Sequence, residues 1–480
     1  MKKKQFGVLA TVALVTAWGS QSVALAQVGE QPRGTNAQAP ASAQHRDPLD
    51  SPGLRPRGLN TGQVGAGTLF NPEISVILDG VFYWDDEDGD IPTPAGFGGG
   101  HHHHGHGHDH AHGELDQGFN LRETEIVFAA AIDNYLDAVV TLAIEGDSGI
   151  EVEEAYAVTR ALPAGFQMKF GKFLSDVGYI NKQHPHDWDF VDRPLMNELL
   201  FGDHGLQEKG VQVSWVPATP FYTRLGVEVL QGETSGVANY VGSGRHEIVG
   251  YAEGTGGTPD RLRWRTNYGL DDVDGPRLFT GFAKFAPDLG YEHALQVGVF
   301  GGYARSFQDV ETHSSGRVEA WDGDGWFAGT DWVYRYDAGR SYGHGDWRLQ
   351  AEYMYRRLSL DYFEGVPGEV GSTTSPEFQN RETRKNDGLY IQAVYGFAPR
   401  WSAGLRYDVV GLTNNDGYDS FDESHRYSAN VTFTATEFSR FRLQVNHGRY
   451  EEDDDHGHGD FTQVMLQYNL SLGAHGAHSF

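Results

Sequence analysis

Hydrophobic and polar residues alternate strictly near the C-terminus of the chain. From Val464 to Leu472, aliphatic residues and Tyr468 occupy every second position, and Met465 and three small polar residues occupy the positions between them. A period of two predicts a β-strand. An apolar face opposite a mainly polar face is typical of a strand that has lipid on one side and water on the other.

The last predicted strand indicates a closed barrel. The chain ends on the aromatic Phe480, as many bacterial outer-membrane barrels do. If 461–480 holds the last strand of a closed barrel, that strand pairs with the first one, near Glu73–Trp84. Closure removes the exposed edges that an open sheet would present, and it makes the first and last long loops neighbours.

The same alternation recurs along the chain and predicts sixteen strands. Each strand alone would also fit a soluble β-sandwich, but short turns alternate with long loops, which is the pattern of outer-membrane barrels with the short turns in the periplasm. We therefore predict an all-β fold, a transmembrane antiparallel up-and-down β-barrel of about 16 strands with both termini in the periplasm. The predicted strands span residues 73–84, 119–132, 136–146, 150–162, 166–178, 209–217, 221–233, 276–288, 293–307, 325–338, 346–363, 387–398, 401–413, 424–438, 440–451 and 461–473.

The N-terminal part is predicted to lie outside the barrel. Three lysines precede an apolar run from Phe6 to Trp18, and Ala24–Ala26 reads as a cleavage site, so residues 1–26 are predicted to be a signal peptide. Residues 27–71 are rich in Gln, Ala, Pro and Gly and predict a flexible periplasmic leader. The barrel would then comprise residues 72–480, in the bacterial outer membrane.

The composition limits the kinds of molecule that the protein is expected to bind. The formal charge of −29 disfavours nucleic acid and attracts cations. The chain has no Cys, so disulfides do not hold it together. The expected partners are outer-membrane lipid and lipopolysaccharide, with the barrel-assembly machinery acting through the C-terminal strand. Monomer and homotrimer both remain open, and no motif indicates an enzyme.

A histidine-rich tract in the first long loop is the most prominent chemical feature. Neutral imidazoles offer a nitrogen lone pair that Zn²⁺, Ni²⁺ and Cu²⁺ favour. The alternatives are a solvated low-complexity loop that binds metal incidentally, or an expression tag. The candidate ligands are His101, His102, His103, His104, His106, His108, Asp109, His110 and His112.

A second acidic and histidine-bearing segment lies in the last long loop, at residues 451–460, and contains His456 and His458. In a closed barrel this loop lies beside the first long loop. We therefore predict one composite extracellular surface that collects metal.

The loop over residues 179–208 carries a third candidate site. His184, His186 and Asp189, with His204 as a further candidate, would form a transit site if this loop folds into the pore. The alternative is a packed constriction loop whose histidines only form hydrogen bonds. Mixed inward charges on the strands are expected to line a wet channel: Glu123, Glu125, Arg224, Glu228, Arg348, Glu352, Arg406 and Arg442.

Four motifs resemble bacterial zinc-regulated TonB-dependent outer-membrane receptors: residues 71–80, 153–156, 184–190 and 473–480. More remotely, the barrel resembles phosphate-selective porins. The resemblance implies expression under zinc limitation, metal passage across the outer membrane and TonB as a partner. Residues 27–71 are too short for the plug domain of such receptors, so a plug-less, porin-like channel is expected.

The sequence thus predicts an outer-membrane channel or receptor for the uptake of divalent metal ions. Zn²⁺ is the expected transported or loop-bound ion, and no tightly bound cofactor is expected. One alternative is a general or anion (phosphate)-selective porin with an incidental His-rich loop. Another is a surface metal buffer or adhesin-like protein with a blocked lumen.

Overall fold

The structure is a computed structural model that describes residues 72–87, 91–97, 115–145, 149–202, 204–242, 245–252, 260–267, 270–312, 317–365, 373–374, 376–415, 420–451 and 458–473. The predicted signal peptide and leader lie outside these residues. Within the described ranges, no helix is both long enough and apolar enough to cross a membrane.

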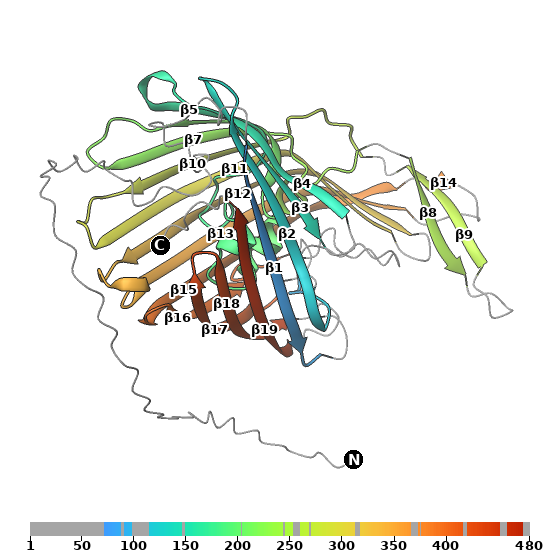
Figure 1. Cartoon of the computed structure of the whole chain (residues 1–480). Coiled ribbons are helices and arrows are strands. Elements are labelled where there is room, and N and C mark those ends of the chain that lie inside the picture. Colours follow the sequence, from blue (N-terminus) through green and yellow to red (C-terminus); the bar gives the residue numbers. More distant parts are fainter. Residues whose placement is uncertain are drawn as a thin grey trace, which may run out of the picture. The chain divides into compact units, whose positions relative to one another are not determined.

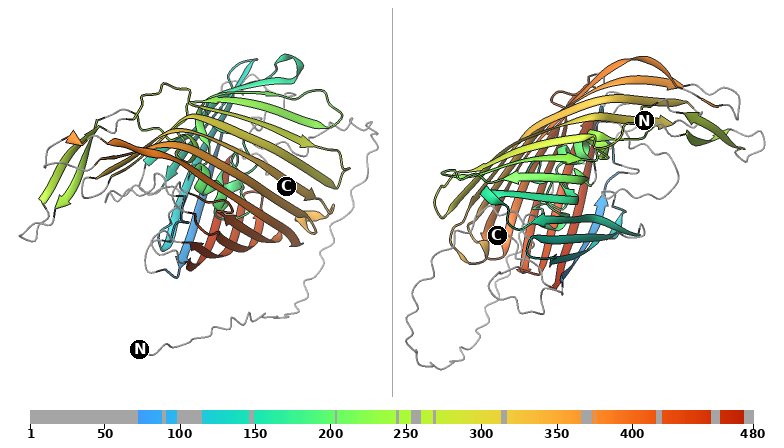
Figure 2. Two further views of the ribbon diagram at one scale, coloured as in Figure 1. Left: turned by 180° about the vertical axis from the view of Figure 1, so that it is seen from behind. Right: turned by 90° about the horizontal axis from the view of Figure 1, so that it is seen from above.

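Sixteen strands close into one antiparallel barrel, as the alternation predicts (Figures 1 and 2). A separate three-stranded sheet consists of β8 (Arg245–Ala252), β9 (Asp260–Asn267) and β14 (Thr373–Thr374). The barrel strands are β1 (Glu73–Asp85), β2 (Gly118–Ala131), β3 (Leu136–Glu145), β4 (Gly149–Thr159), β5 (Phe166–Leu174), β6 (Gln207–Trp215), β7 (Tyr222–Leu230), β10 (Leu278–Ala286), β11 (His293–Thr312), β12 (Val318–Tyr336), β13 (Trp347–Gly365), β15 (Glu377–Ala398), β16 (Trp401–Val410), β17 (Ser424–Thr436), β18 (Ser439–Glu451) and β19 (His458–Gly473).

The barrel closes through the first and last strands. β1 pairs antiparallel with β19, with Leu78 opposite Leu470 and Trp84 opposite Val464, and the two lie side by side in Figure 1. The predicted closure is therefore confirmed. The structure extends β15 upstream of its predicted start, because β13 continues to pair with it through Asp361 and Arg381, whose side chains form a 2.7 Å ion pair.

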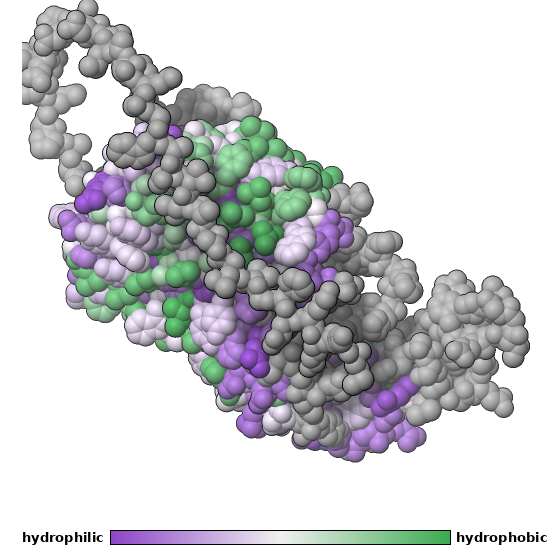
Figure 3. Space-filling model, turned by 90° about the horizontal axis from the view of Figure 1, so that it is seen from below, coloured by the Kyte–Doolittle hydropathy of each residue, from purple (hydrophilic) through white to green (hydrophobic). Residues whose placement is uncertain are grey.

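The outer face of the barrel is apolar. Val227, Leu405 and Leu443 are 60%, 67% and 51% exposed, while neighbouring inward residues such as Arg406 and Gln444 are buried. Figure 3 shows an apolar area on one face of the barrel, bordered by polar side chains. A closed barrel leaves no unpaired edge in lipid, and an apolar exterior suits the bilayer core. The barrel therefore lies in the bacterial outer membrane.

Aromatic side chains gather near the short turns. Trp347 and Tyr395 stack with ring centroids 4.5 Å apart, and Trp401 and Phe433 lie 4.7 Å apart. Tyr395, Trp401 and Phe433 lie near strand ends that short turns connect, and Trp347 begins β13 opposite Tyr395. Aromatic girdles of this kind occupy the membrane–water interface of outer-membrane barrels.

The connection between β5 and β6, residues 175–206, enters the barrel interior and is called the lumen loop below. Glu352 on β13 accepts hydrogen bonds from the backbone N–H groups of Tyr179 (3.1 Å) and Ile180 (2.8 Å). Gly178 lies at φ 66° and packs so closely on the Glu352 carboxylate that a side chain would not fit. The loop is thus fixed to one wall at its start.

Basic side chains hold the lumen loop on other strands. Arg442 on β18 donates to the Trp188 carbonyl oxygen (2.8 Å). Arg406 on β16 pairs with Asp192 at 2.8 Å. Contacts on β13, β16 and β18 show that the loop crosses the lumen. Some of the inward charges expected to line water, such as Glu352 and Arg442, are instead buried against this loop.

The loop also introduces an apolar cluster into the barrel. Helix α1 (Leu195–Phe201) buries Met196 and Phe201 in a cluster that includes Met354 on β13 and Tyr390 on β15. The Phe201 ring meets Phe327 on β12 edge-on at 5.6 Å. Figure 2 shows this helix inside the ring of strands. The interior is therefore divided, with an apolar packed part here and charged side chains elsewhere.

Candidate metal site in the lumen

Four inward glutamates form an acidic area on β2 and β4. Glu123 and Glu125 alternate along β2, so both face the lumen. Glu153 and Glu154 are consecutive on β4, yet both are buried. The register between β3 and β4 shifts here by one residue, a β-bulge that turns two neighbouring side chains to the same side.

A short turn of the lumen loop lies over these carboxylates. Pro185 opens the 3₁₀ turn Pro185–Asp187, and its fixed φ suits a first helical position. The turn stacks the rings of His184 and His186 with centroids 5.7 Å apart. Both imidazoles therefore face the acidic wall.

The distances between imidazole and carboxylate atoms are short. His184 Nδ1 lies 3.4 Å from Glu153 Oε2 and 3.6 Å from Glu125 Oε2, and His184 Nε2 lies 3.1 Å from Glu154 Oε2. His186 Nδ1 lies 3.0 Å from Glu125 Oε2. Two histidines thus share three carboxylates.

Three of these residues are spaced to hold one ion. Single ligand atoms of Glu125, Glu153 and His184 all lie within 4.8 Å of one another. Tetrahedral Zn²⁺ with nitrogen and oxygen ligands keeps those atoms roughly 3.3 Å apart. One nitrogen with two carboxylates suits a borderline ion such as Zn²⁺. We refer to Glu125, Glu153 and His184 as the lower site.

The charge on the histidines follows from this setting. Burial lowers the pKa of His184, but the charges of Glu125 and Glu153 and the hydrogen bonds to Glu153 and Glu154 outweigh it, so its pKa lies well above the usual value. Burial also lowers the pKa of His186, but the charges of Glu125 and Asp187 outweigh it, so the pKa of His186 is raised. The carboxylates therefore favour the protonated form of both imidazoles, so a metal ion that binds there competes with protons.

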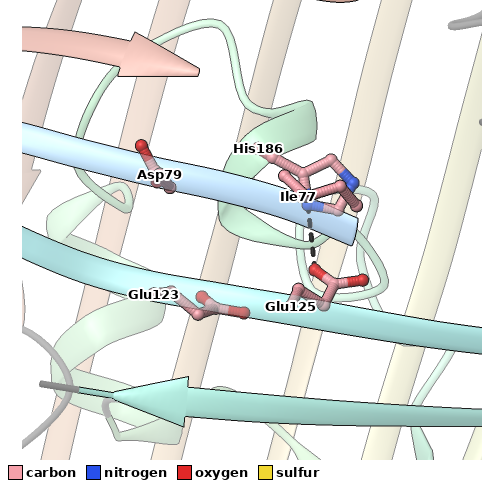
Figure 4. A pocket seen from close by; sticks show the side chains of 5 residues that line it. All are labelled: Ile77, Asp79, Glu123, Glu125 and His186. Atoms are coloured by element: carbon pink, nitrogen blue, oxygen red, sulfur yellow. Dashed lines mark ion pairs between the residues drawn. The ribbon is translucent and has the colours of Figure 1, made fainter. Parts of the chain in front are cut away.

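A small hollow lies beside the lower site, between β1 and β2 (Figure 4). It is lined by Ile77, Asp79, Glu123, Glu125 and His186. Glu123 is 7% exposed, and its Oε1 atom accepts no hydrogen bond from the described residues.

The structure separates Asp189 from the two histidines with which the sequence grouped it. Asp189 Oδ1 pairs with Arg348 at 2.6 Å, and Asp189 Oδ2 lies 3.5 Å from Gln392 Nε2. His204 lies exposed near the end of the loop. The lumen site therefore combines His184 and His186 with wall carboxylates, and Asp189 contributes to another wall.

The predicted extracellular surface falls almost wholly outside the described residues. This applies to all of residues 101–112 and to His456. His458 begins β19, with its backbone opposite Glu451. The metal-collecting rim therefore remains a prediction.

Sequence reasoning did not assign Glu153 and Glu154 to the site. An acidic pair in a predicted strand is ambiguous, because strict alternation turns only one of two neighbours inward. The bulge that turns both inward depends on pairing with β3 and leaves no clear pattern in the sequence.

Other proteins resemble this chain in sequence or in fold. No family model matches the chain. A protein of Aquifex aeolicus (strain VF5) described as "Uncharacterized protein" is 36% identical over 380 residues, which cover 77% of this chain and 72% of that protein. Among solved structures, OmpTdeltaL8, a loop L8 deletion mutant of the Vibrio cholerae outer-membrane protein OmpT, is 12% identical over 84% of this chain and 99% of its own, with a TM-score of 0.46. The outer-membrane channel DcaP of Acinetobacter baumannii is 13% identical over 84% of this chain and 96% of its own, also with a TM-score of 0.46.

Proposed function

The chain belongs to one family with the Aquifex aeolicus protein, and from its own geometry we propose that it is an outer-membrane channel that admits divalent metal ions, Zn²⁺ first. A barrel of sixteen strands is wide enough to enclose an aqueous path. The lumen loop narrows that path and carries the two histidines.

The observation that carries this proposal is the lower site. Glu125, Glu153 and His184 come from β2, β4 and the lumen loop, and they converge within 4.8 Å. Two buried carboxylates close together repel one another unless a cation lies between them. A proton on His184 would supply part of that charge, and a metal ion would supply more.

The location of the site supports transit rather than a structural role. Its ligands join a constriction loop to the barrel wall, so an ion bound there lies on the path through the lumen. Conduction requires a site that binds well enough to admit an ion and weakly enough to release it. The predicted histidine-rich rim would raise the local ion concentration above that site.

Zinc flux into proteoliposomes that contain a fluorescent chelator tests the proposal. Glu153→Gln keeps the side-chain shape and removes one charged ligand, so zinc flux should fall by about 10-fold or more, given the cost typical of changes around metal ligands. Glu382→Gln is the matched control, because Glu382 is also an inward, buried glutamate, on β15. Equal flux through both variants would refute the lower site as the path of zinc.

Whether zinc passage is passive or driven by TonB needs a separate experiment. The family resemblance implies TonB, whereas a channel that carries the lower site in an open path would work without it. Zinc uptake should be measured in a deletion strain that carries this chain, with and without TonB. Uptake that persists without TonB supports passive passage.

A second candidate function, anion passage, is favoured by one observation. Arg442 is 2% exposed, and its hydrogen bonds within the described residues go to the neutral oxygens of Thr432, Gln467 and Trp188. A buried guanidinium without a carboxylate partner attracts anions. Reversal potentials in planar bilayers under a salt gradient distinguish the two candidates by their sign.

A further inference from the structure

Exposed side chains from β11, β12, β13 and β15 form one row on the outer face of the barrel. These strands follow one another in the barrel wall (Figure 1). Tyr303 on β11 lies opposite Trp326 on β12, and Trp326 lies opposite Arg357 on β13. Arg357 in turn lies opposite Lys385 on β15. All of these side chains are exposed, and directly opposite residues of paired strands point to the same face. We call Tyr303, Trp326, Arg357 and Lys385 the outer row.

The length of β13 places the outer row along the barrel axis. Arg356 and Leu358, on either side of Arg357, are buried, so Arg357 points outward. Trp347 begins β13 in the aromatic girdle near the short turns, and Arg357 follows ten residues later. Ten residues of strand span about 34 Å, and a tilt of about 40° leaves roughly 26 Å along the axis. Since the apolar band of such barrels is about 25 Å tall, the outer row lies where the headgroups of the outer leaflet begin.

Aromatic rings in the row agree with this level. Trp326 packs on Tyr355, with ring centroids 5.4 Å apart, and Tyr303 is 47% exposed beside it. Trp and Tyr collect at both membrane–water interfaces, because one part of each ring system is apolar and the other is polar. The two cations of the row therefore lie level with a second aromatic girdle, on the side of the long loops.

No carboxylate within the described ranges pairs with the two cations of the row. Asp361 pairs instead with Arg381, four residues before Lys385 on β15, at 2.7 Å. Asp324 on β12 lies opposite Ser359 and forms no ion pair with Arg357. Other outward cations near the long-loop ends of their strands do have partners: Lys172 pairs with Glu151 at 3.1 Å, Lys209 with Glu233 at 2.7 Å, and Arg449 with Asp460 at 3.8 Å. Like charges directly opposite in a sheet are destabilising, so an anion from outside the chain would stabilise this pair.

We propose that Arg357 and Lys385 bind phosphate groups of lipopolysaccharide in the outer leaflet, with Trp326 and Tyr303 packing beside its sugar and acyl groups. A guanidinium donates two parallel N–H groups to phosphate oxygens, and an ammonium adds a point charge. The row lies on the long-loop side, which is the leaflet that presents lipopolysaccharide. This gives the expected contact with lipopolysaccharide a defined place, and it does not depend on the path of zinc through the lumen.

The charge of the row sets the size of the effect. One basic side chain near an anionic lipid surface strengthens binding roughly fivefold, so two should strengthen it about 30-fold. Free phosphate in water should bind this exposed pair only weakly, because exposed ion pairs contribute little. Lipid phosphate differs, since the membrane holds it at the level of the row.

Binding of diphosphoryl lipid A to the full chain, purified in a neutral detergent, tests the proposal. The double variant Arg357→Gln with Lys385→Gln should bind it about 30-fold more weakly than wild type. Fully dephosphorylated lipid A should bind weakly, and equally to both proteins. Arg381→Gln is the matched control, because Arg381 is also an exposed, outward arginine on β15 but already pairs with Asp361; its affinity should stay within about twofold of wild type.

Two further variants separate loss of the site from loss of folding. Arg357→Lys with Lys385→Arg exchanges the two cations and keeps both charges, so it should bind within a few-fold of wild type. Lys385→Gln alone should lower the affinity roughly fivefold, and it carries the test if the double Gln variant does not fold.

Inorganic phosphate and phosphatidylglycerol, added as competitors, identify the source of the phosphate. Neither should displace diphosphoryl lipid A at the concentrations at which unlabelled lipid A does. Displacement by inorganic phosphate would overturn a lipid ligand, and equal competition by phosphatidylglycerol would overturn the assignment to lipopolysaccharide.

Three other results would overturn the site itself. These are equal affinity of wild type and the Gln variants, an equal loss in Arg381→Gln, and tight binding of dephosphorylated lipid A. Zinc flux should be unchanged in the double Gln variant, so a failure of this inference leaves the proposed function untouched.

Discussion

The hydrogen bonds that Glu352 accepts from the start of the lumen loop give a prediction whose size follows from the structure. Glu352 is 1% exposed, and its carboxylate accepts the backbone N–H groups of Tyr179 and Ile180. Glu352→Ala removes both acceptors and leaves two buried donors without partners. Each orphaned donor costs about 1–3 kcal/mol.

The two donors together predict a loss of about 2–6 kcal/mol in the docking of this part of the loop. Water that enters the space left by the side chain would satisfy the donors in part, so the lower end of the range is the working value. At 1.4 kcal/mol for each factor of ten, about 2 kcal/mol raises the population of the locally open loop roughly 30-fold.

Hydrogen exchange followed by mass spectrometry measures that population, because an amide exchanges only when its hydrogen bond opens. Peptides that contain Tyr179 and Ile180 should exchange roughly 30-fold faster in Glu352→Ala. Glu364→Ala is the control on the same strand, since Glu364 pairs at 2.8 Å with the partly exposed Arg317, and such pairs contribute little. Unchanged exchange at Tyr179 and Ile180 would refute Glu352 as the anchor of the loop.

Three further predictions concern the site, the closure and the outer face. Zinc affinity, measured by calorimetry, should fall as the pH is lowered from about 8 to about 6, because protonated His184 has no lone pair for metal. The raised pKa of His184 makes this loss of affinity begin at a higher pH than for a free histidine. A zinc affinity that does not change with pH would exclude His184 as a ligand. The stability of the metal-free protein should change with pH in the opposite direction. The ion pairs of protonated His184 stabilise the fold at lower pH, and this stabilisation is lost as the pH rises through the raised pKa of His184. Gly80→Val should reduce the yield of heat-modifiable folded barrel on unheated gels, since a side chain there would overlap the Tyr468 ring across the β1–β19 closure; a normal yield would contradict that packing. Leu443→Arg should destabilise the barrel in lipid by up to about 2–4 kcal/mol in urea titrations, because Leu443 faces outward, and an unchanged midpoint would place it away from the bilayer core.

The sequence alone determined the barrel, because its information is local and periodic. A period of two defines each strand and its apolar face, as Val464–Leu472 illustrates. Turn and loop lengths then set the order of the strands, so the pairing of β1 with β19 could be predicted. Strand ends were less certain, and β15 begins earlier than expected because its pairing with β13 continues past the apolar pattern.

Only the tertiary structure decided the site. The lumen loop has no period, so its path depends on which wall side chains bind it, and those contacts join residues far apart in the sequence. His184 therefore meets Glu125 and Glu153, while Asp189, five residues later, pairs with Arg348 on β13. The sequence identified these histidines as pore ligands only on the condition that the loop folds inward. The packing of the loop against the wall decided that it does and determined which carboxylates the histidines meet.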